Sequence, residues 1–192
     1  KDNVALLSEI NRVIAQLQTQ GVLDRLKAKW IDSKYSVPPG ITLTKGPSLR
    51  GVLRVGTCAT IEPFSFQAGG MLTGLDIELA QLIGERLAKS IQVEDMRFES
   101  LIPALQSGKI DFALSNFNVT DERKKLISFS LPYIENDISA LVRKLPQSKV
   151  PGNHGTAAKT GGGKLVSPAD LKDKKVAVLM GSAHDTYATK NY

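Results

Sequence analysis

The feature that most constrains the fold is an alternation of apolar strands and amphipathic helices between residues 52 and 115. The segments VLRVGT (52–57), IQVEDMRF (91–98) and IDFALS (110–115) are typical of strands. The segments GLDIELAQLIGERLA (74–88) and SLIPALQSG (100–108) lie between them and are typical of helices. Strands that alternate with helices pair in parallel through right-handed crossovers. The sequence therefore predicts an α/β fold, with an open, mostly parallel sheet and flanking helices.

The ends of the chain carry further helix and strand patterns. Residues 3–19 predict a helix, with an apolar stripe made by Leu7, Ile10, Ile14 and Leu17 and widened by Leu6 and Val13. A shorter helix is expected over 23–31, with Leu26 and Trp30 four residues apart. Residues 137–144 predict one more strand, and KVAVLM (175–180) predicts a buried strand after which Gly181 and Ser182 begin another helix. Because residues 165–192 are expected to hold one strand and two short helical pieces, they are too few to form a hydrophobic core of their own.

Changes in composition predict five segments. Residues 1–33 hold the first helices, and 34–50 form a connector rich in Pro, Gly and Ser. Residues 51–144 carry the strand–helix alternation. A flexible connector is expected over 145–164, because it is poor in apolar residues, and 165–192 begin a new unit.

Composition excludes several classes of function. One cysteine, Cys58, excludes an intrachain disulfide framework and a cysteine-based zinc site, and the two histidines lack metal-ligand spacing, so we expect neither metal nor cofactor. The net charge of +6 comes from dispersed lysines without interleaved aromatic residues, which argues against nucleic acid as a partner. No apolar run has the length of a membrane helix, and the first residues do not resemble a signal peptide, so export would imply a leader already removed.

Polar residues gather at the predicted carboxyl ends of the strands, where open parallel sheets bind ligands. These ends are 57–60, Phe98, 115–118 and 181–183. They offer hydroxyls, amides and an aromatic ring, without a nucleophile beside a base or a pair of carboxylates. A small polar ligand held without chemistry fits this set better than a reaction does, so the chain is not predicted to be an enzyme.

Arg123 stands at a predicted helix start, where the macrodipole does not favour a cation. Thr120 is the expected N-cap, and acidic residues follow it. A guanidinium in that place can bind a carboxylate through charge-assisted hydrogen bonds, with Ser115, Asn116 and Asn118 available for an amino group. The alternative is a surface ion pair with Asp121, Glu122 or Asp111. The residues around Arg123 do not decide between a carboxylate-binding site and a surface ion pair.

The segments from GLDIELAQLIGERLA through FESLIPALQSGKIDFALSNFNVTDERKKLISFSLPYIENDISALVRK resemble lobe 1 of the family 3 extracytoplasmic solute-binding proteins, over about 53–144. The later segment DLKDKKVAVLMGSAHDTY is similar to the start of that family's lobe 2. The resemblance implies a periplasmic-binding-protein-like type II lobe of a receptor that closes on a free amino acid. It also implies the permease subunits of an ABC importer as partners, and a periplasmic or other extracytoplasmic location.

The resemblance also implies roles for individual residues. Arg123 would bind the ligand α-carboxylate, with Thr120 nearby, while Ser115 and Asn118 would lie at the amino and carboxylate ends. Phe98 would line the side-chain pocket. From lobe 2, Ser182 and Ala183 would close over the carboxylate, with His184 beside them.

Three departures from the family change what is expected. Cys58 stands where the family often has an acidic residue, and Ile61 where it has an aromatic lid, which favours a polar or neutral ligand over a cationic one. Residues 6–31 resemble the family's C-terminal helices although they come first. A junction between tandem domains and a circular permutation both explain this order, and either way the helices are expected to pack on lobe 1. Most of lobe 2, including the aspartate for the ligand ammonium, has no counterpart. Such a chain is expected to bind weakly, to pair with a second chain that completes the fold, or to swap elements between copies.

Two other functions remain as alternatives to amino-acid binding. The chain would then be a structural lobe without a ligand, or a dehydratase-like enzyme on the same scaffold. The enzyme needs a catalytic acid at the cleft. Glu62 is the nearest candidate, but it precedes Pro63 in a turn and is expected to face solvent.

Overall fold

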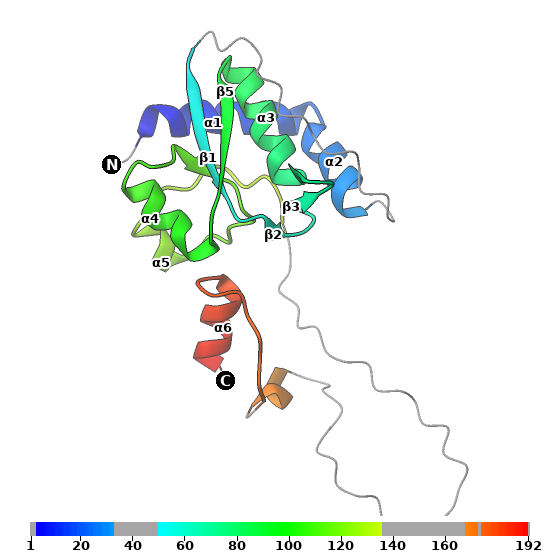
Figure 1. The fold of residues 1–192 in the computed structure, drawn as a ribbon, viewed down its shortest axis with the longest axis vertical. Coiled ribbons are helices and arrows are strands. Elements are labelled where there is room, and N and C mark those ends of the chain that lie inside the picture. The colour runs from blue at the N-terminus through cyan, green and yellow to red at the C-terminus, as the bar shows by residue number, and fades with distance from the viewer. Residues whose placement is uncertain (1–2, 33–49, 136–167, 173, 192) are drawn as a thin grey trace, which may run out of the picture.

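The computed structural model describes residues 3–32, 50–135, 168–172 and 174–191 (Figure 1). The predicted strand over 137–144 and nearly all of both connectors lie outside these described residues. The rest of the predicted elements can be compared with the structure. None of the helices in the described ranges is long and apolar enough to cross a membrane.

A three-stranded parallel sheet forms the centre of the lobe, in the order β5–β1–β6. The strands are β1 (Val52–Thr57), β5 (Ser90–Asp95) and β6 (Phe112–Ala113). β1 pairs with β5 along its whole length, and Val55 lies opposite Phe112 on its other side. The predicted α/β class with parallel pairing is therefore confirmed. β6 is shorter than the predicted 110–115, although Asp111 and Leu114 continue the backbone hydrogen bonds to β1 on either side.

Two helices connect these strands. α3 (Leu75–Leu87) buries Ile77, Ala80, Ile83 and Leu87, the four positions on the expected apolar side. α4 (Leu101–Gln106) lies within the second predicted helix. The strand predicted over 91–98 ends at Asp95, and Phe98 instead begins a 3-10 turn, η2 (Phe98–Ser100), directly before α4.

A small antiparallel sheet, absent from the prediction, follows β1. It consists of β2 (Thr60–Ile61), β3 (Ser65–Ala68) and β4 (Met71–Thr73) in that order. Gly69 and Gly70 connect β3 to β4 with φ angles of +58° and +77°, which suits the tight turn of a hairpin. The strands are too short to give a clear alternation of apolar residues, so the glycine pair is their main sequence signal.

The first helices pack against the lobe, next to α3 in Figure 1. They are α1 (Val4–Thr19) and α2 (Val22–Lys27), and α2 continues into a π-helical turn, η1 (Ala28–Asp32). On α1 the residues that face the core are Leu6, Ile10, Val13, Ile14 and Leu17, whereas Leu7 is only half-buried. Trp30 meets Phe66 edge to face at 6.2 Å between ring centroids, and its Nε1 donates to Glu78. These contacts join the helices to one continuous apolar core.

The C-terminal segment lies apart from this core (Figure 1). It consists of a 3-10 turn, η3 (Pro168–Leu171), an extended stretch over 174–180, and α6 (Ala183–Asn191). The helix was predicted, but the buried strand over 175–180 was wrong. Val176, Val178, Leu179 and Met180 are exposed because no strand among the described residues pairs with this stretch and no helix covers it. An apolar pattern alone does not bury a strand.

Candidate functional site

The loop that follows β6 holds the polar residues expected at the strand ends. Ser115 is completely buried, and its Oγ accepts a hydrogen bond of 3.1 Å from the backbone N–H of Cys58, just after β1. Asn116 has a φ of +47°, in the left-handed region, and its N–H donates to Asp76 at 3.0 Å. The carboxyl ends of the two neighbouring strands β1 and β6 are thus joined at one edge of the sheet.

A short helix, α5 (Asp121–Lys124), places Arg123 beside this loop. Thr120 caps the helix as predicted: its Oγ1 accepts from the backbone N–H of Arg123 at 3.3 Å. The cap fixes the backbone of Arg123.

The Arg123 side chain is nearly buried, with 8% of the residue exposed. Its Nη1 donates to the carbonyl of Asn118 and its Nη2 to the carbonyl of Gly181, both at 2.8 Å. The guanidinium carbon lies 5.5 Å from the ring centroid of Phe98 and 5.1 Å from that of Phe117, and the two rings stack at 4.6 Å. Burial lowers the pKa of Arg123, yet a guanidinium stays charged in proteins. The site is therefore a fixed cation held between carbonyl oxygens and aromatic rings.

The surface ion pair considered for Arg123 is absent from the described residues. Each of its three candidate partners pairs elsewhere. Asp121 contacts Lys124, Glu122 contacts Lys190, and Asp111 contacts Arg54. The alternative in which Arg123 is a structural ion pair with one of these carboxylates is wrong. A guanidinium has more N–H donors than the two carbonyls accept, so donors remain for an anion.

The residues expected from the C-terminal segment differ in their surroundings. Ser182 is buried, and its Oγ accepts from the N–H of Asp185 at 3.1 Å, which caps the start of α6. Ala183 is half-buried at the first turn, and His184 is exposed. The structure brings the backbone of this turn to Arg123 through the Gly181 carbonyl, but the imidazole of His184 faces solvent.

Phe98 and Cys58 form the apolar side of the site. Both are buried in one small cluster with Leu101, Ala104 and Ile110. The Cys58 Sγ lies 3.2 Å from the Thr60 Oγ1, and either atom can be the donor. Cys58 is thus a small buried residue that fills space below the strand ends.

Sequence reasoning missed two residues that support the site, Asp76 and Tyr133. Asp76 is fully buried at the start of α3, and its Oδ1 accepts from the Tyr133 hydroxyl at 2.8 Å. Burial raises the pKa of Asp76 to about 6 and raises that of Tyr133 above its ordinary value, since desolvation disfavours both charged forms. The sequence offered one signal for Asp76, its place between two apolar residues in GLDIEL. The preference of helix N-termini for acidic residues explains an aspartate there equally well, so the signal did not point to a buried side chain.

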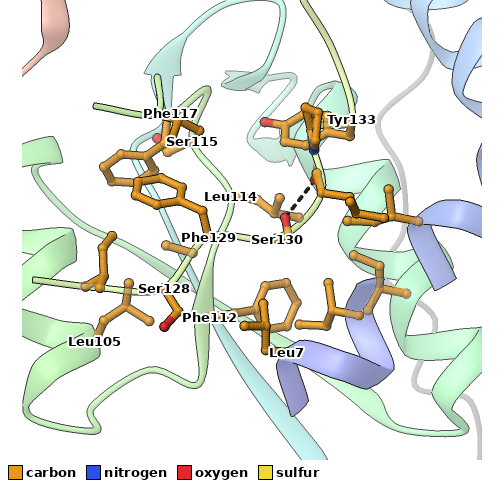
Figure 2. Close-up of a pocket in the computed structure, with 18 of the residues that line it drawn as sticks. Leu7, Leu105, Phe112, Leu114, Ser115, Phe117, Ser128, Phe129, Ser130 and Tyr133 are labelled. Atoms are coloured by element: carbon orange, nitrogen blue, oxygen red, sulfur yellow. Dashed lines mark hydrogen bonds between the residues drawn. The ribbon is translucent and has the colours of Figure 1, made fainter. Parts of the chain in front are cut away.

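A cavity of about 420 Å³ lies on the other side of the loop, and Figure 2 shows it. Leu7 from α1, Phe112 from β6, and Phe129 and Tyr133 from the following segment line it. Its wall combines apolar and polar side chains, and it includes Ser115, Asn116 and Asn118 but not Arg123. The cavity therefore shares the loop after β6 with the cation site, while the guanidinium lies outside it. No group of acidic, histidine or cysteine side chains in the described ranges could hold a metal ion.

Comparison with known proteins identifies the family. The sequence profile of the bacterial extracellular solute-binding proteins, family 3, matches residues 53–183. The L-cystine-binding protein TcyJ of Escherichia coli K12 is 35% identical over 143 residues, which is 74% of this chain and 48% of that protein. The arginine-binding extracellular protein ArtP of Bacillus subtilis 168 is 35% identical over 133 residues, covering 69% of this chain and 46% of that protein.

Solved structures with similar sequences include an ancestral arginine-binding protein bound to arginine. It is 49% identical over 45% of this chain and 38% of its own, with a TM-score of 0.44. The arginine-bound form of domain 1 from TmArgBP is 44% identical over 44% of this chain and 68% of its own, with a TM-score of 0.43. This chain spans about half the length of the curated relatives it matches. Because the profile match extends over most of its residues, the chain belongs to the bacterial extracellular solute-binding proteins of family 3.

Proposed function

We propose that this chain is the amino-acid-binding component of an ABC importer, and that Arg123 binds the α-carboxylate of a free polar or neutral amino acid. The observation that carries the proposal is a nearly buried guanidinium that meets no carboxylate among the described residues. The relatives support it, because their names describe them as binding L-cystine, arginine and histidine.

The guanidinium is already oriented before a ligand arrives. The Asn118 carbonyl fixes one Nη atom and the rings of Phe98 and Phe117 restrict the plane. A carboxylate can then form paired charge-assisted hydrogen bonds without first ordering a long side chain. Since α5 has only four residues, the carboxylate affinity comes from the guanidinium and not from a helix dipole.

The remaining predicted residues surround this point. The Ser115 hydroxyl and the side chains of Asn116 and Asn118 would bind the amino group and the second carboxylate oxygen. Phe98 would form a wall of the side-chain pocket. The Gly181 carbonyl occupies one guanidinium nitrogen, so a ligand carboxylate would replace it there while Ser182 and Ala183, with His184 beside them, close over the ligand.

The ligand preference follows from the apolar side of the site. Cys58 is a thiol buried against Thr60, and Ile61 is a half-buried aliphatic side chain. Because of these residue types, neither position supplies a carboxylate or a stacking ring. A cationic side chain would lack a partner at these two positions. We therefore expect a polar or neutral amino acid as the ligand. Because two relatives are named as arginine-binding proteins, a test of ligands should include arginine as well.

The order of segments supports a lobe built from residues 51–144 with the helices of 1–33 attached to it, followed by a second unit from 165. The contacts of α1 and η1 with α3 support the attachment, including the Lys29–Glu78 ion pair at 2.7 Å. A tandem junction or a permutation would account for the order. Permease subunits would recognise the closure of the two lobes at an extracytoplasmic surface.

Catalysis gains no support from the described residues. Glu62, the candidate catalytic acid, is exposed. A lobe without a ligand remains the alternative that the following experiment separates from the proposal.

The experiment is a thermal-shift and calorimetric screen of the chain against the free amino acids. A ligand present at a hundred times its Kd stabilises the fold by about 2.7 kcal/mol. Arg123→Ala is expected to abolish the response. Arg86→Ala is the matched control. Arg86 lies on the exposed side of α3, where it donates to the Gln20 side chain after α1, so its replacement should leave binding unchanged.

Two results would contradict the proposal. One is the absence of a response to every amino acid, which would identify a lobe without a ligand. The other is a response that Arg123→Ala leaves intact, which would place the carboxylate elsewhere.

A further inference from the structure

A buried carboxylate holds the loop that carries the proposed ligand-binding residues. Asp76 is fully buried in the first turn of α3. Its Oδ2 accepts from the backbone N–H of Asn116 at 3.0 Å, and its Oδ1 accepts from the Tyr133 hydroxyl at 2.8 Å. One side chain therefore ties the helix to the loop after β6 and to the segment near Glu135.

The loop needs such an anchor at Asn116. This residue is not glycine, yet its φ of +47° lies in the left-handed region, which a side chain makes less favourable. A hydrogen bond from its N–H to an ionised acceptor is stronger than one to a neutral acceptor. The bond to Asp76 thus stabilises an otherwise less favourable backbone conformation, in the residue between Ser115 and Phe117.

We propose that Asp76 is a positioning residue that fixes the backbone at Asn116, and through it the Ser115 hydroxyl and the Asn118 carbonyl that orients Arg123. The backbone connects Asn116 to both residues, and each of them makes a hydrogen bond of its own: the Ser115 Oγ accepts from the N–H of Cys58, and the Asn118 carbonyl accepts from the guanidinium. Asp76 touches no ligand in this scheme. Its effect on ligand affinity rests on the proposed function, whereas its effect on the loop does not.

A titration seen at Asp76 can be assigned to this carboxyl group, because one other titratable side chain contacts it among the described residues. Among the described residues Tyr133 is the titratable group that contacts the carboxylate. Glu78, on the same helix, is engaged by Lys29 and Trp30, and Cys58 lies beyond Ser115. Burial raises the pKa of Asp76 to about 6, and the hydrogen bonds from Tyr133 and Asn116 oppose that rise. Removing the Tyr133 hydroxyl should therefore raise this pKa further.

The first test follows the Asn116 amide by NMR in the ligand-free full chain while pH is varied. The expected result is a titration of the Asn116 amide proton with the same midpoint as the Asp76 carboxyl carbon. Tyr133→Phe should move both midpoints to higher pH. Asp76→Asn should abolish the titration and speed hydrogen exchange at Asn116.

Leu79→Ala is the control, because Leu79 is equally buried on α3 but makes no contact with the loop through hydrogen bonds. It should lower stability and leave the titration of Asn116 unchanged. An Asn116 amide that does not follow Asp76 would overturn the proposal. So would a loss of the titration in Leu79→Ala equal to that in Asp76→Asn.

The second test measures affinity for whichever amino acid the wild-type chain binds. Asp76→Ala should weaken binding by about tenfold or more, the equivalent of one lost charge-assisted hydrogen bond. Asp76→Asn, which can still accept from Asn116, should recover part of the loss, and Leu79→Ala should not change the Kd.

Equal affinity in Asp76→Ala and wild type would overturn the positioning role. A wild-type chain that binds no amino acid contradicts the proposed function instead, while the Asn116 titration still decides the role of Asp76. If Asp76→Ala does not fold, Tyr133→Phe and Asp76→Asn carry both measurements.

Discussion

The lobe and the C-terminal segment start from similar sequence patterns and reach different structures. β1 and the stretch 175–180 are both short segments rich in apolar residues. Val55, in β1, has a paired strand on each side and is 1% exposed, whereas Val178 has none among the described residues and is 39% exposed. The comparison shows that an apolar run specifies a strand only when neighbouring strands and a covering helix are available.

Arg123 lies where these two regions meet. One of its Nη atoms is bonded to the lobe, at Asn118, and the other to the C-terminal segment, at Gly181. Outside this contact, a side-chain link between the regions is the exposed ion pair between Glu122 and Lys190 at 3.1 Å. The lobe thus supplies the stable part of the site, and the C-terminal segment approaches it through a few polar contacts.

The largest expected effect compares two identical substitutions, one in each region. Leu79→Ala removes a completely buried side chain from the core and should lower the free energy of unfolding by about 2–5 kcal/mol. Leu179→Ala removes a side chain that is 39% exposed in the C-terminal segment and should change it by less than about 0.5 kcal/mol. Urea denaturation followed by circular dichroism measures both. Equal effects would mean that the two regions share one core.

A pH series sharpens the comparison, because Asp76 is the buried carboxylate among the described residues and belongs to the lobe. Its pKa rises from an ordinary 3.8 to about 6 in the folded chain. The folded state therefore binds the proton more tightly, and this stability is present below pH 4 and lost as pH rises through 6. The change is about 3 kcal/mol.

The measurement is urea unfolding of wild type and Asp76→Asn between pH 4 and 7. The difference between the two curves isolates Asp76 from the carboxylates that titrate at the surface. A difference that stays constant across this range would contradict a raised pKa at Asp76.

Arg123→Ala should have a smaller effect on folding than on binding. Loss of the contacts with Phe98 and Phe117 is expected to cost about 1 kcal/mol of unfolding free energy, since the pair is partly desolvated. The same variant removes the bond to the Gly181 carbonyl, so amide exchange at Ser182 should become faster. Thermal denaturation and hydrogen-exchange mass spectrometry measure these effects. A loss as large as that of Leu79→Ala would make Arg123 a structural residue of the lobe.

The smallest effect is expected at the exposed ion pair. Glu122→Gln removes the partner of Lys190, and both side chains are more than half exposed. Solvent screens such a pair, so the unfolding midpoint should not change measurably. The contrasting control is Glu78→Gln, which removes a less exposed carboxylate shared by Lys29 and Trp30 and should lower the midpoint. A greater loss at Glu122 would show that the C-terminal segment is held more firmly than its contacts suggest.

The sequence predicted those parts of the fold in which local periodicity and tertiary burial agree. α3 and α1 were predictable because their apolar residues recur at helical spacing, and β1 because it is a short segment rich in β-branched and apolar residues. The Thr120 cap was predictable from its position before acidic residues. The hairpin β3–β4 was missed, since its strands are too short to show alternation.

The sequence suggested residues for the candidate site but not the bonds between them. Arg123 contacts the loop after β6 through the Asn118 carbonyl and the Phe117 ring, and such partners leave no pattern in a sequence. Asp76 and Tyr133 are 57 residues apart, and their hydrogen bond depends on the folded topology. The exposure of 175–180 likewise depends on strands that are absent from its neighbourhood among the described residues.

The central claim is that the carboxylate of a free amino acid binds to Arg123, at the edge of the lobe. The most direct measurement is a titration of the Arg123 guanidinium NMR signals with the free amino acids. We predict a saturable shift of these signals with a polar or neutral amino acid, together with the Asn118 amide. Unchanged Arg123 signals with every amino acid would contradict the claim, as would a ligand that shifts the signals of Leu7 and Phe112, on the far wall of the cavity, and not those of Arg123.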